Sequence, residues 1–255
     1  MKILDCNLTY GASINGTPPH GCDTFADLMA ELDRAGISGG LVRCRYSDTV
    51  GVNYGNETLA RDLIKGREAG YSVYGVWAAL PPFTGETPAP EVLPAAMRQN
   101  GIAAVYLAPA VHRYEPARLT LGPLVEVLQQ RRIPVILNTA LGISMPQIYA
   151  LLEAFPRLTA VIGDSDCWPN ARRLYPLASV YPNVHLDLSY VMDAGGVEDT
   201  VSRFGAEKLL FGTAFPDRYT GSMLAVVRAA RIGEDDRALI FGGNLERLIK
   251  EADLS

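Results

Sequence analysis

Short apolar runs alternate with amphipathic segments along the whole of this 255-residue chain. The apolar runs are rich in Val, Ile, Leu or Tyr and are bounded by Gly, Pro or Asn, a pattern that predicts buried strands. The strands are predicted over residues 3–9, 40–46, 72–79, 103–108, 134–139, 158–163, 183–189 and 208–213. Helices are predicted between them and after the last of them, over residues 24–35, 57–69, 90–99, 120–131, 145–155, 170–180, 197–204, 223–231 and 244–252.

Repeated strand–helix units require a parallel sheet that is covered by helices. About eight such units in a chain of this length favour a closed barrel over an open sheet. We therefore predict an α/β fold, a single-domain (β/α)8 TIM barrel that spans residues 1–255.

The lengths of the predicted links indicate which end of the barrel carries function. Links from helix to strand are short, whereas the strand-to-helix links 10–23, 47–56 and 80–89 are long and rich in Gly, Pro, Asn and Ser. Long loops on one face are typical of a barrel whose site lies at the carboxyl ends of its strands. Each of the three long links is a candidate lid.

Charge and cysteine content narrow the class of partner. The formal net charge is -5 and no basic stretch offsets it, which argues against a nucleic acid or an anionic membrane. No apolar stretch reaches the ~20 residues that span a bilayer, and the N-terminus lacks the pattern of a signal peptide. The four cysteines are scattered without a CxxC pair, which is typical of free thiols in the cytoplasm. We expect a cytoplasmic protein that binds a small anionic molecule. The chain could also form a homo-oligomer.

Common catalytic motifs are missing from the sequence. There is no GxGxxG, P-loop, GxSxG or HExxH motif, so nucleotide binding and a serine nucleophile have no support. The histidines His20, His112 and His185 are far apart, and none forms an HxH pair.

Two C-terminal segments carry a family resemblance. Residues 209–216 read Leu-Leu-Phe-Gly-Thr-Ala-Phe-Pro, and residues 240–248 read Ile-Phe-Gly-Gly-Asn-Leu-Glu-Arg-Leu. They resemble the closing strand and helix of the amidohydrolase-related (amidohydrolase-2) family of the amidohydrolase superfamily. Asp5 and Gly11 match that family's D-x-H-x-H-x-G opening. The resemblance covers nearly the whole chain and implies a (β/α)8 barrel. It also implies a metal-dependent hydrolase or decarboxylase of small, often carboxylated, molecules.

The sequence departs from the family at every metal position. The two first-strand histidines fall on Asn7 and Thr9, and the fifth-strand histidine falls on Asn138. The sixth-strand histidine falls on Asp164, and the eighth-strand aspartate, which is both ligand and general base, falls on Ala214. Neutral amide and hydroxyl oxygens are poor ligands for zinc. We therefore expect no metal and no other cofactor.

Strand alternation predicts which side chains face the barrel interior. On the first strand it turns Asp5, Asn7 and Thr9 inward and Leu4, Cys6 and Leu8 toward the helices. The rest of the inward set is Arg43, Arg45, Trp77, Tyr106, Asn138, Asp164, Asp166, His185, Asp187 and Ser189.

The inward arginines and aromatic residues each have two interpretations. Arg43 and Arg45 either clamp a substrate carboxylate or phosphate, or pair internally with Asp5, Asp164 or Asp187. Trp77 and Tyr106 either wall a ligand site or simply fill the barrel.

Asp164 is predicted to be the acid–base residue. The alternative is that it caps the following helix, a role that suits Asp166 better. His185 is predicted to be a structural histidine, whereas His20 and His112 lie in or near loops from which they could reach the pocket.

Three functions remain open. The first is a metal-independent hydrolase or lyase of a small anionic molecule, in which Asp164 is catalytic. Its substrate would be bound by Arg43, Arg45, Asn7, Thr9, Asn138, Trp77 and Tyr106. The second is a catalytically inactive homologue that serves as a ligand- or partner-binding module. The third is a metal-dependent hydrolase with a relocated metal, held by Asp164, Asp187 and a loop histidine.

Overall fold

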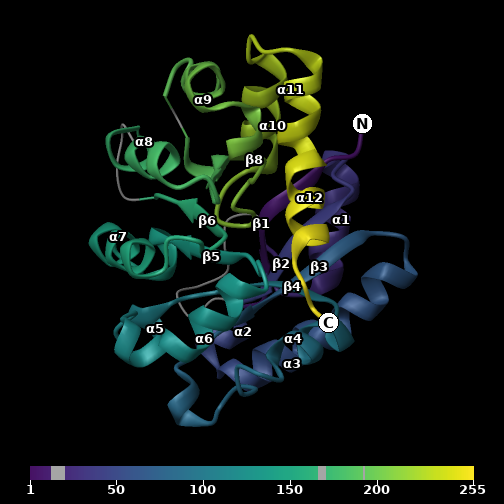
Figure 1. Ribbon diagram of the computed structural model, residues 1–255. Helices are drawn as coiled ribbons and strands as arrows, with labels where there is room; N and C mark the ends of the chain where they lie inside the picture. Colours follow the sequence, from purple (N-terminus) through teal and green to yellow (C-terminus); the bar gives the residue numbers. More distant parts are fainter. Residues whose placement is uncertain (13–20, 166–170, 192) are drawn as a thin grey trace.

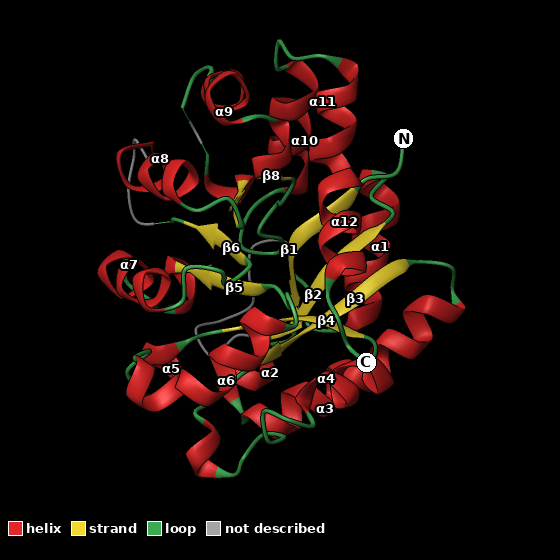
Figure 2. Cartoon of the chain, viewed as in Figure 1, coloured by secondary structure: helices red, strands yellow, loops and turns green. Residues whose placement is uncertain are grey.

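The computed structural model describes residues 1–12, 21–165, 171–191 and 193–255, and it shows the predicted barrel (Figures 1 and 2). Eight parallel strands form one sheet in the order of the sequence. They are β1 (Leu4–Tyr10), β2 (Gly39–Cys44), β3 (Ser72–Ala78), β4 (Ile102–Tyr106), β5 (Val135–Asn138), β6 (Ala160–Gly163), β7 (Val184–Asp187) and β8 (Leu209–Leu210). The segment after β8 returns to β1, because Cys6 N–H donates to Phe211 O at 2.8 Å and Thr9 N–H donates to Phe215 O at 2.9 Å.

Most helices pack around the outside of the barrel (Figure 2). The described helices are α1 (Phe25–Ala35), α2 (Tyr46–Thr49), α3 (Val52–Glu68), α4 (Leu93–Asn100), α5 (Pro109–His112), α6 (Arg118–Gln130), α7 (Met145–Ala154), α8 (Ala171–Val180), α9 (Gly196–Phe204), α10 (Thr220–Ala229), α11 (Glu234–Ala238) and α12 (Asn244–Glu251). Single 3-10 turns include Pro82–Thr84 and Leu188–Tyr190. In the described part of the chain, no helix is long and apolar enough to cross a membrane.

The segment 47–56 is not the predicted loop, because α2 and the first turn of α3 occupy it. Its Gly, Asn and Tyr residues have low helix propensity, but tertiary contacts stabilise the helical turns. The Asn56 side chain donates to Ala78 O at 3.1 Å and accepts from Ala78 N–H at 3.0 Å. A side chain at Gly55 would overlap the backbone of Ser47, so only glycine lets α3 approach α2 this closely.

One strand irregularity overturns part of the predicted alternation. The pairing of β1 with β2 shifts register between Asp5 and Leu8. Leu4 and Cys6 consequently lie in the interior cluster, and the prediction that they face the helices is wrong, whereas Leu8 packs in the outer cluster as predicted. A bulge of this kind adds a residue to one strand and changes which face the following side chains occupy.

The β3 side chains alternate without interruption, but in the opposite phase from the prediction. Val76 and Ala78 face the barrel interior, and Trp77 packs in the outer cluster between strands and helices. The Trp77 indole N–H donates to the Asn56 carbonyl of α3 at 3.1 Å. The prediction that Trp77 faces the interior is therefore wrong, and this side chain does not wall the barrel mouth.

Helix α12 lies across the amino-terminal end of the barrel, toward the viewer in Figure 1. Its Leu245 and Leu248 join the interior cluster with Leu4 and Leu210. Apolar side chains therefore close this end, while the carboxyl ends of the strands carry most of the buried polar residues.

Candidate active site

Arg43 is held at the carboxyl end of β2 by three contacts. Its Nη1 donates to Asp48 Oδ2 at 2.9 Å and its Nη2 donates to Thr9 Oγ1 at 3.0 Å. The guanidinium carbon lies 4.9 Å from the centre of the Tyr106 ring, in cation–π contact. Arg43 and Tyr106 thus face the interior as predicted, but the ion-pair partner is Asp48, which was not among the carboxylates expected.

Asp48, on the short helix α2, is the centre of this cluster. It accepts the Tyr106 hydroxyl at 2.6 Å, and His112 Nε2 lies 3.4 Å from the same oxygen. Burial alone would raise the pKa of Asp48, but the His112 contact and the Arg43 charge outweigh it and hold that pKa below its usual value. Burial and the Asp48 charge raise the pKa of Tyr106 well above its usual value, so the phenol stays protonated. His112 therefore reaches this cluster through Asp48.

A pair of buried carboxyl groups, Asp5 and Asp187, lies at β1 and β7. Asp5 accepts the Thr213 hydroxyl at 2.5 Å and the Asn7 N–H at 2.8 Å. Burial raises the pKa of Asp5 to about 7, and the Asp187 charge acts in the same direction. Burial also raises the pKa of Asp187, which accepts the Ser189 hydroxyl at 2.6 Å. The charge of Asp187 therefore favours the protonated form of Asp5.

Asn7 connects the carboxyl pair to the centre of the mouth. Its amide donates to Asp187 Oδ2 at 2.9 Å. The Tyr190 side chain, on the turn after β7, also interacts with Asn7 and with Asn138 of β5. Burial raises the pKa of Tyr190, and the hydrogen bonds with Asn7 and Asn138 oppose that rise. Tyr190 therefore reaches side chains from opposite sides of the barrel. Sequence reasoning missed it, although it directly follows the predicted strand 183–189.

Asp164 lies directly after β6 and is 1% exposed. Its Oδ1 lies 2.6 Å from Arg173 Nη2 of α8 and accepts the Thr139 hydroxyl at 3.3 Å. Its arginine partner therefore comes from the following helix and not from β2. The neighbouring candidate Asp166 lies outside the described residues, as do His20 and Cys167.

Arg45 follows β2 at the rim of the barrel and has a weaker set of partners than Arg43. Its Nη2 donates at 2.9 Å to Asp217, whose side chain is 57% exposed. Its Nε is buried and has no hydrogen-bond partner among the residues that the structure describes. A buried donor without an acceptor is costly, so this guanidinium is suited to a further anionic partner.

His185 lies at the other end of the barrel, near the start of β7. It is 4% exposed, and its Nδ1 donates to the Glu207 carbonyl at 3.0 Å. Burial lowers its pKa to about 4, so the ring is neutral. The prediction of a structural histidine is confirmed.

The comparisons with known proteins agree with this architecture. A family model described as amidohydrolase matches residues 52–250. The chain belongs to the amidohydrolase family. The prediction from residues 209–216 and 240–248 is thereby confirmed. A search among curated proteins gives no match.

Several solved structures share this amidohydrolase fold. An uncharacterized TIM-barrel protein from Bordetella bronchiseptica is 23% identical with a TM-score of 0.73, and 99% of each chain is covered. The 5-carboxyvanillate decarboxylase from Sphingomonas paucimobilis is 13% identical with a TM-score of 0.68, over 98% of this chain and 99% of that one. A dihydroxybenzoic acid decarboxylase from Polaromonas, with bound manganese and the inhibitor 2-nitroresorcinol, is 14% identical with a TM-score of 0.67. The match covers 98% of this chain and 97% of that one. At such low sequence identities, the structural likeness shows only that these proteins share a fold with this chain.

The residues of this amidohydrolase do not fit the metal that the family implies. Asn7 directs its amide N–H at Asp187, and Asn138 Oδ1 accepts from Ala140 N–H at 2.9 Å. The Ala214 side chain offers no ligand atom, and Asp164 is paired with Arg173. Within the described residues, no group of three or more His, Cys, Asp or Glu side chains is arranged to hold a metal ion. A transition-metal site needs about three such ligands.

Proposed function

We propose that the carboxyl-terminal mouth of this barrel binds a small carboxylated molecule and acts on it as a hydrolase or lyase without the family's metal. The observation that carries the proposal is Arg45, a rim guanidinium with a buried Nε that lacks an acceptor among the described residues. A carboxylate accepts two parallel N–H bonds from such a group. By their names, the decarboxylases of similar fold act on carboxylated or hydroxylated aromatic acids.

The proposed mechanism divides the work among the residues of the mouth. Arg45 binds the carboxylate, while Arg43 and Tyr106 form a fixed wall beside it. Thr9, Asn7 and Asn138 supply hydrogen bonds to the substrate from β1 and β5. Asp164, which Arg173 and Thr139 orient, exchanges the proton with the reacting group.

A second candidate function is binding without turnover. Tyr190 interacts with both Asn7 and Asn138, which stand at family metal positions, so a tyrosine and two amides occupy the region where the family holds its metal. Turnover assays with 5-carboxyvanillate and 2,6-dihydroxybenzoate separate the two functions. Ligand binding without any product would favour the binding module.

Replacing Arg45 with alanine is expected to weaken binding of an aromatic carboxylate such as 2,6-dihydroxybenzoate by roughly 10- to 100-fold. One charge-assisted hydrogen bond contributes about 1.5–3 kcal/mol, and 1.4 kcal/mol corresponds to a factor of ten. Ligand-dependent thermal shift measures the change, since a ligand that binds the native state raises its stability. The control is Arg61→Ala, an exposed arginine on α3. Equal stabilisation of Arg45→Ala and wild type would remove Arg45 from the site.

Elemental analysis of protein purified without chelators is expected to find far less than one zinc, manganese or iron per chain. Neutral donors at Asn7, Thr9 and Asn138 bind such ions weakly. The comparison variant is Asp164→Asn, which removes the single carboxylate at the family positions. About one ion per chain in wild type, lost in this variant, would restore the relocated-metal hypothesis.

A further inference from the structure

A cavity lies at the amino-terminal end of the barrel, opposite the proposed active site. Its volume is about 820 Å³, and its lining includes Thr159, Asn183 and Lys208. Each of these residues directly precedes a strand, β6, β7 or β8 respectively. The cavity is therefore separate from the mouth, where the strands end.

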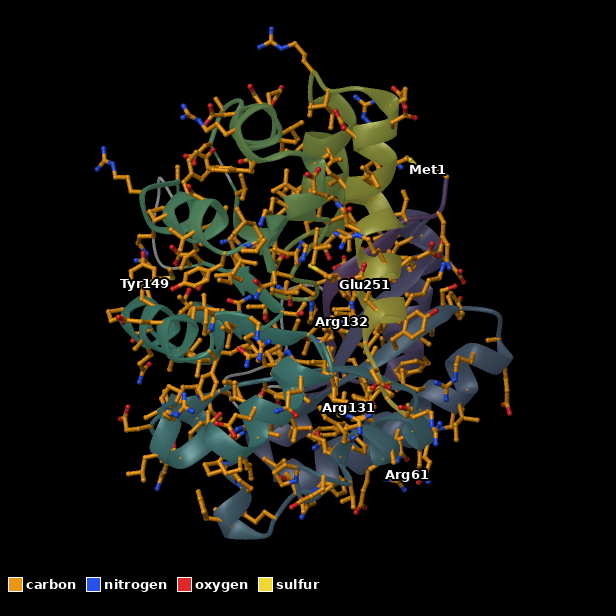
Figure 3. The ribbon with its side chains drawn as sticks, viewed as in Figure 1. Met1, Arg61, Arg131, Arg132, Tyr149 and Glu251 are labelled. Carbon is orange, nitrogen blue, oxygen red and sulfur yellow. The ribbon has the colours of Figure 1, made fainter. Side chains whose placement is uncertain are left out.

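Positive charge is concentrated around this cavity. The lining contains Arg132, Arg157, Lys208 and Arg247 against the two carboxylates Glu207 and Glu251, an excess of two positive charges on a chain whose formal net charge is -5. Arg132 and Glu251 are labelled close together in Figure 3, at the end of the barrel that faces the viewer.

Two of these cations have no side-chain partner among the described residues. Glu251 lies 3.5 Å from Arg247, and Lys208 donates to the carbonyls of Tyr181 and Pro182. By contrast, the side chains of Arg132 and Arg157 form no hydrogen bond or ion pair with any residue that the structure describes. Their guanidinium groups therefore keep all their donors for a ligand.

Backbone contacts fix part of this cavity. The Lys208 ammonium is anchored by backbone carbonyls, and Gln129 Oε1 accepts the backbone N–H of Arg157 at 2.9 Å. Arg132 has a φ of 53°, the left-handed conformation of the turn that ends α6, where Ile133 N–H donates to Leu128 O at 2.9 Å. Buried His185 lines the same cavity, and the charges of Arg247 and Lys208 add to burial in lowering its pKa.

We infer that this cavity is a binding site for a small phosphorylated, hydroxyl-bearing molecule, such as a polyol or sugar phosphate. Arginine forks match the oxygen geometry of a phosphoryl group, and Lys208 adds a fixed point charge. Gln129, Gln130, Asn183 and Thr159 supply amide and hydroxyl groups for the ligand's hydroxyls. The lining has no Phe, Tyr or Trp ring on which a nucleobase could stack, which disfavours a nucleotide.

Calorimetric titration with glycerol 3-phosphate in low-salt buffer tests the site. We expect saturable binding, weaker binding of inorganic phosphate and none of glycerol. The double variant Arg132→Ala/Arg157→Ala is expected to raise the Kd by at least about tenfold, because two charge-assisted contacts are lost. The matched control is Arg131→Ala, since this neighbouring arginine pairs with Asp253 instead.

The location is tested by the NMR signals of the three histidines. The His185 ring should shift on titration, whereas His112 at the opposite end should not. Arg45→Ala should leave the Kd for glycerol 3-phosphate unchanged. The absence of a site in this cavity would therefore be distinguishable from a failure of the proposed active site. No binding to wild type would overturn the inference. Equal binding by the double variant, or a shift of His112 alone, would do the same.

Discussion

Replacing Arg43 with methionine is expected to destabilise the protein by about 3–5 kcal/mol, the usual cost of removing one partner of a buried ion pair. The side chains of Arg43 and Asp48 are only 12% and 15% exposed, so Asp48 would lose its guanidinium in a site that water barely reaches. The Thr9 hydroxyl and the face of the Tyr106 ring would lose the same contact. For a domain of this size the melting temperature should fall on the order of 10 °C.

Urea unfolding of three variants distinguishes the ion pair from simple loss of packing. Methionine keeps most of the apolar volume, and Arg43→Lys keeps the charge but cannot span Asp48 and Thr9 together. We expect Arg43→Lys to fall between wild type and Arg43→Met. Arg61→Met, on the exposed face of α3, should change stability by less than about 0.5 kcal/mol. A loss below about 1 kcal/mol in Arg43→Met would show that the Asp48 cluster does not depend on this pair.

The stability of the wild-type protein is expected to decrease as the pH rises from 5 to 8, and Asp5→Asn should remove most of this decrease. The folded state raises the pKa of Asp5 from 3.8 to about 7, so it binds more protons than the unfolded state over that range. Stability is therefore highest below the unfolded pKa and is lost as the pH passes through the folded pKa. A shift of this size corresponds to about 4 kcal/mol in total.

Asparagine is the suitable replacement because it resembles the protonated acid. Its carbonyl can accept the N–H groups that now reach Asp5 Oδ1 from Asn7 and Thr213, and its amide can donate to the Thr213 hydroxyl. Asp5→Asn should consequently exceed wild type in stability at pH 8. The pKa of Asp187 is raised too, so a smaller slope of the same sign should remain.

The control for this experiment is Asp235→Asn, an exposed carboxylate on α11. It should keep the full pH dependence of wild type when urea unfolding is measured at several pH values. The same slope in wild type and Asp5→Asn would assign the proton to another group. A wild-type stability that rises with pH would contradict the raised pKa itself.

The sequence by itself determined the barrel, because strand and helix periodicity are local patterns that each segment carries alone. Eight apolar runs separated by amphipathic ones allow one closed parallel arrangement in a chain of this length. The inward direction of Arg43 followed from the same alternation, since β2 pairs with β3 without irregularity. The motifs at residues 209–216 and 240–248 were sufficient to place the chain in its family.

Only the tertiary structure decided which faces and partners the candidate residues have. The register shift in β1 arises where neighbouring strands must align, so the direction of Cys6 could not be counted from that strand alone. The direction of Trp77 depends on the phase of β3, which its pairing with β2 sets. Arg43 pairs with Asp48 because the first residues of the predicted loop 47–56 fold as helix α2, which propensity did not favour.

The same holds for contacts between distant segments. Asp164 meets Arg173 because α8 packs back on the barrel, and Tyr190 meets Asn138 across the mouth. The basic cavity gathers Arg132, Arg157 and other residues from segments well separated along the chain. Hydrophobic alternation determines that a side chain is buried, but the partner it meets there depends on how distant segments are brought together by packing, which no local pattern encodes.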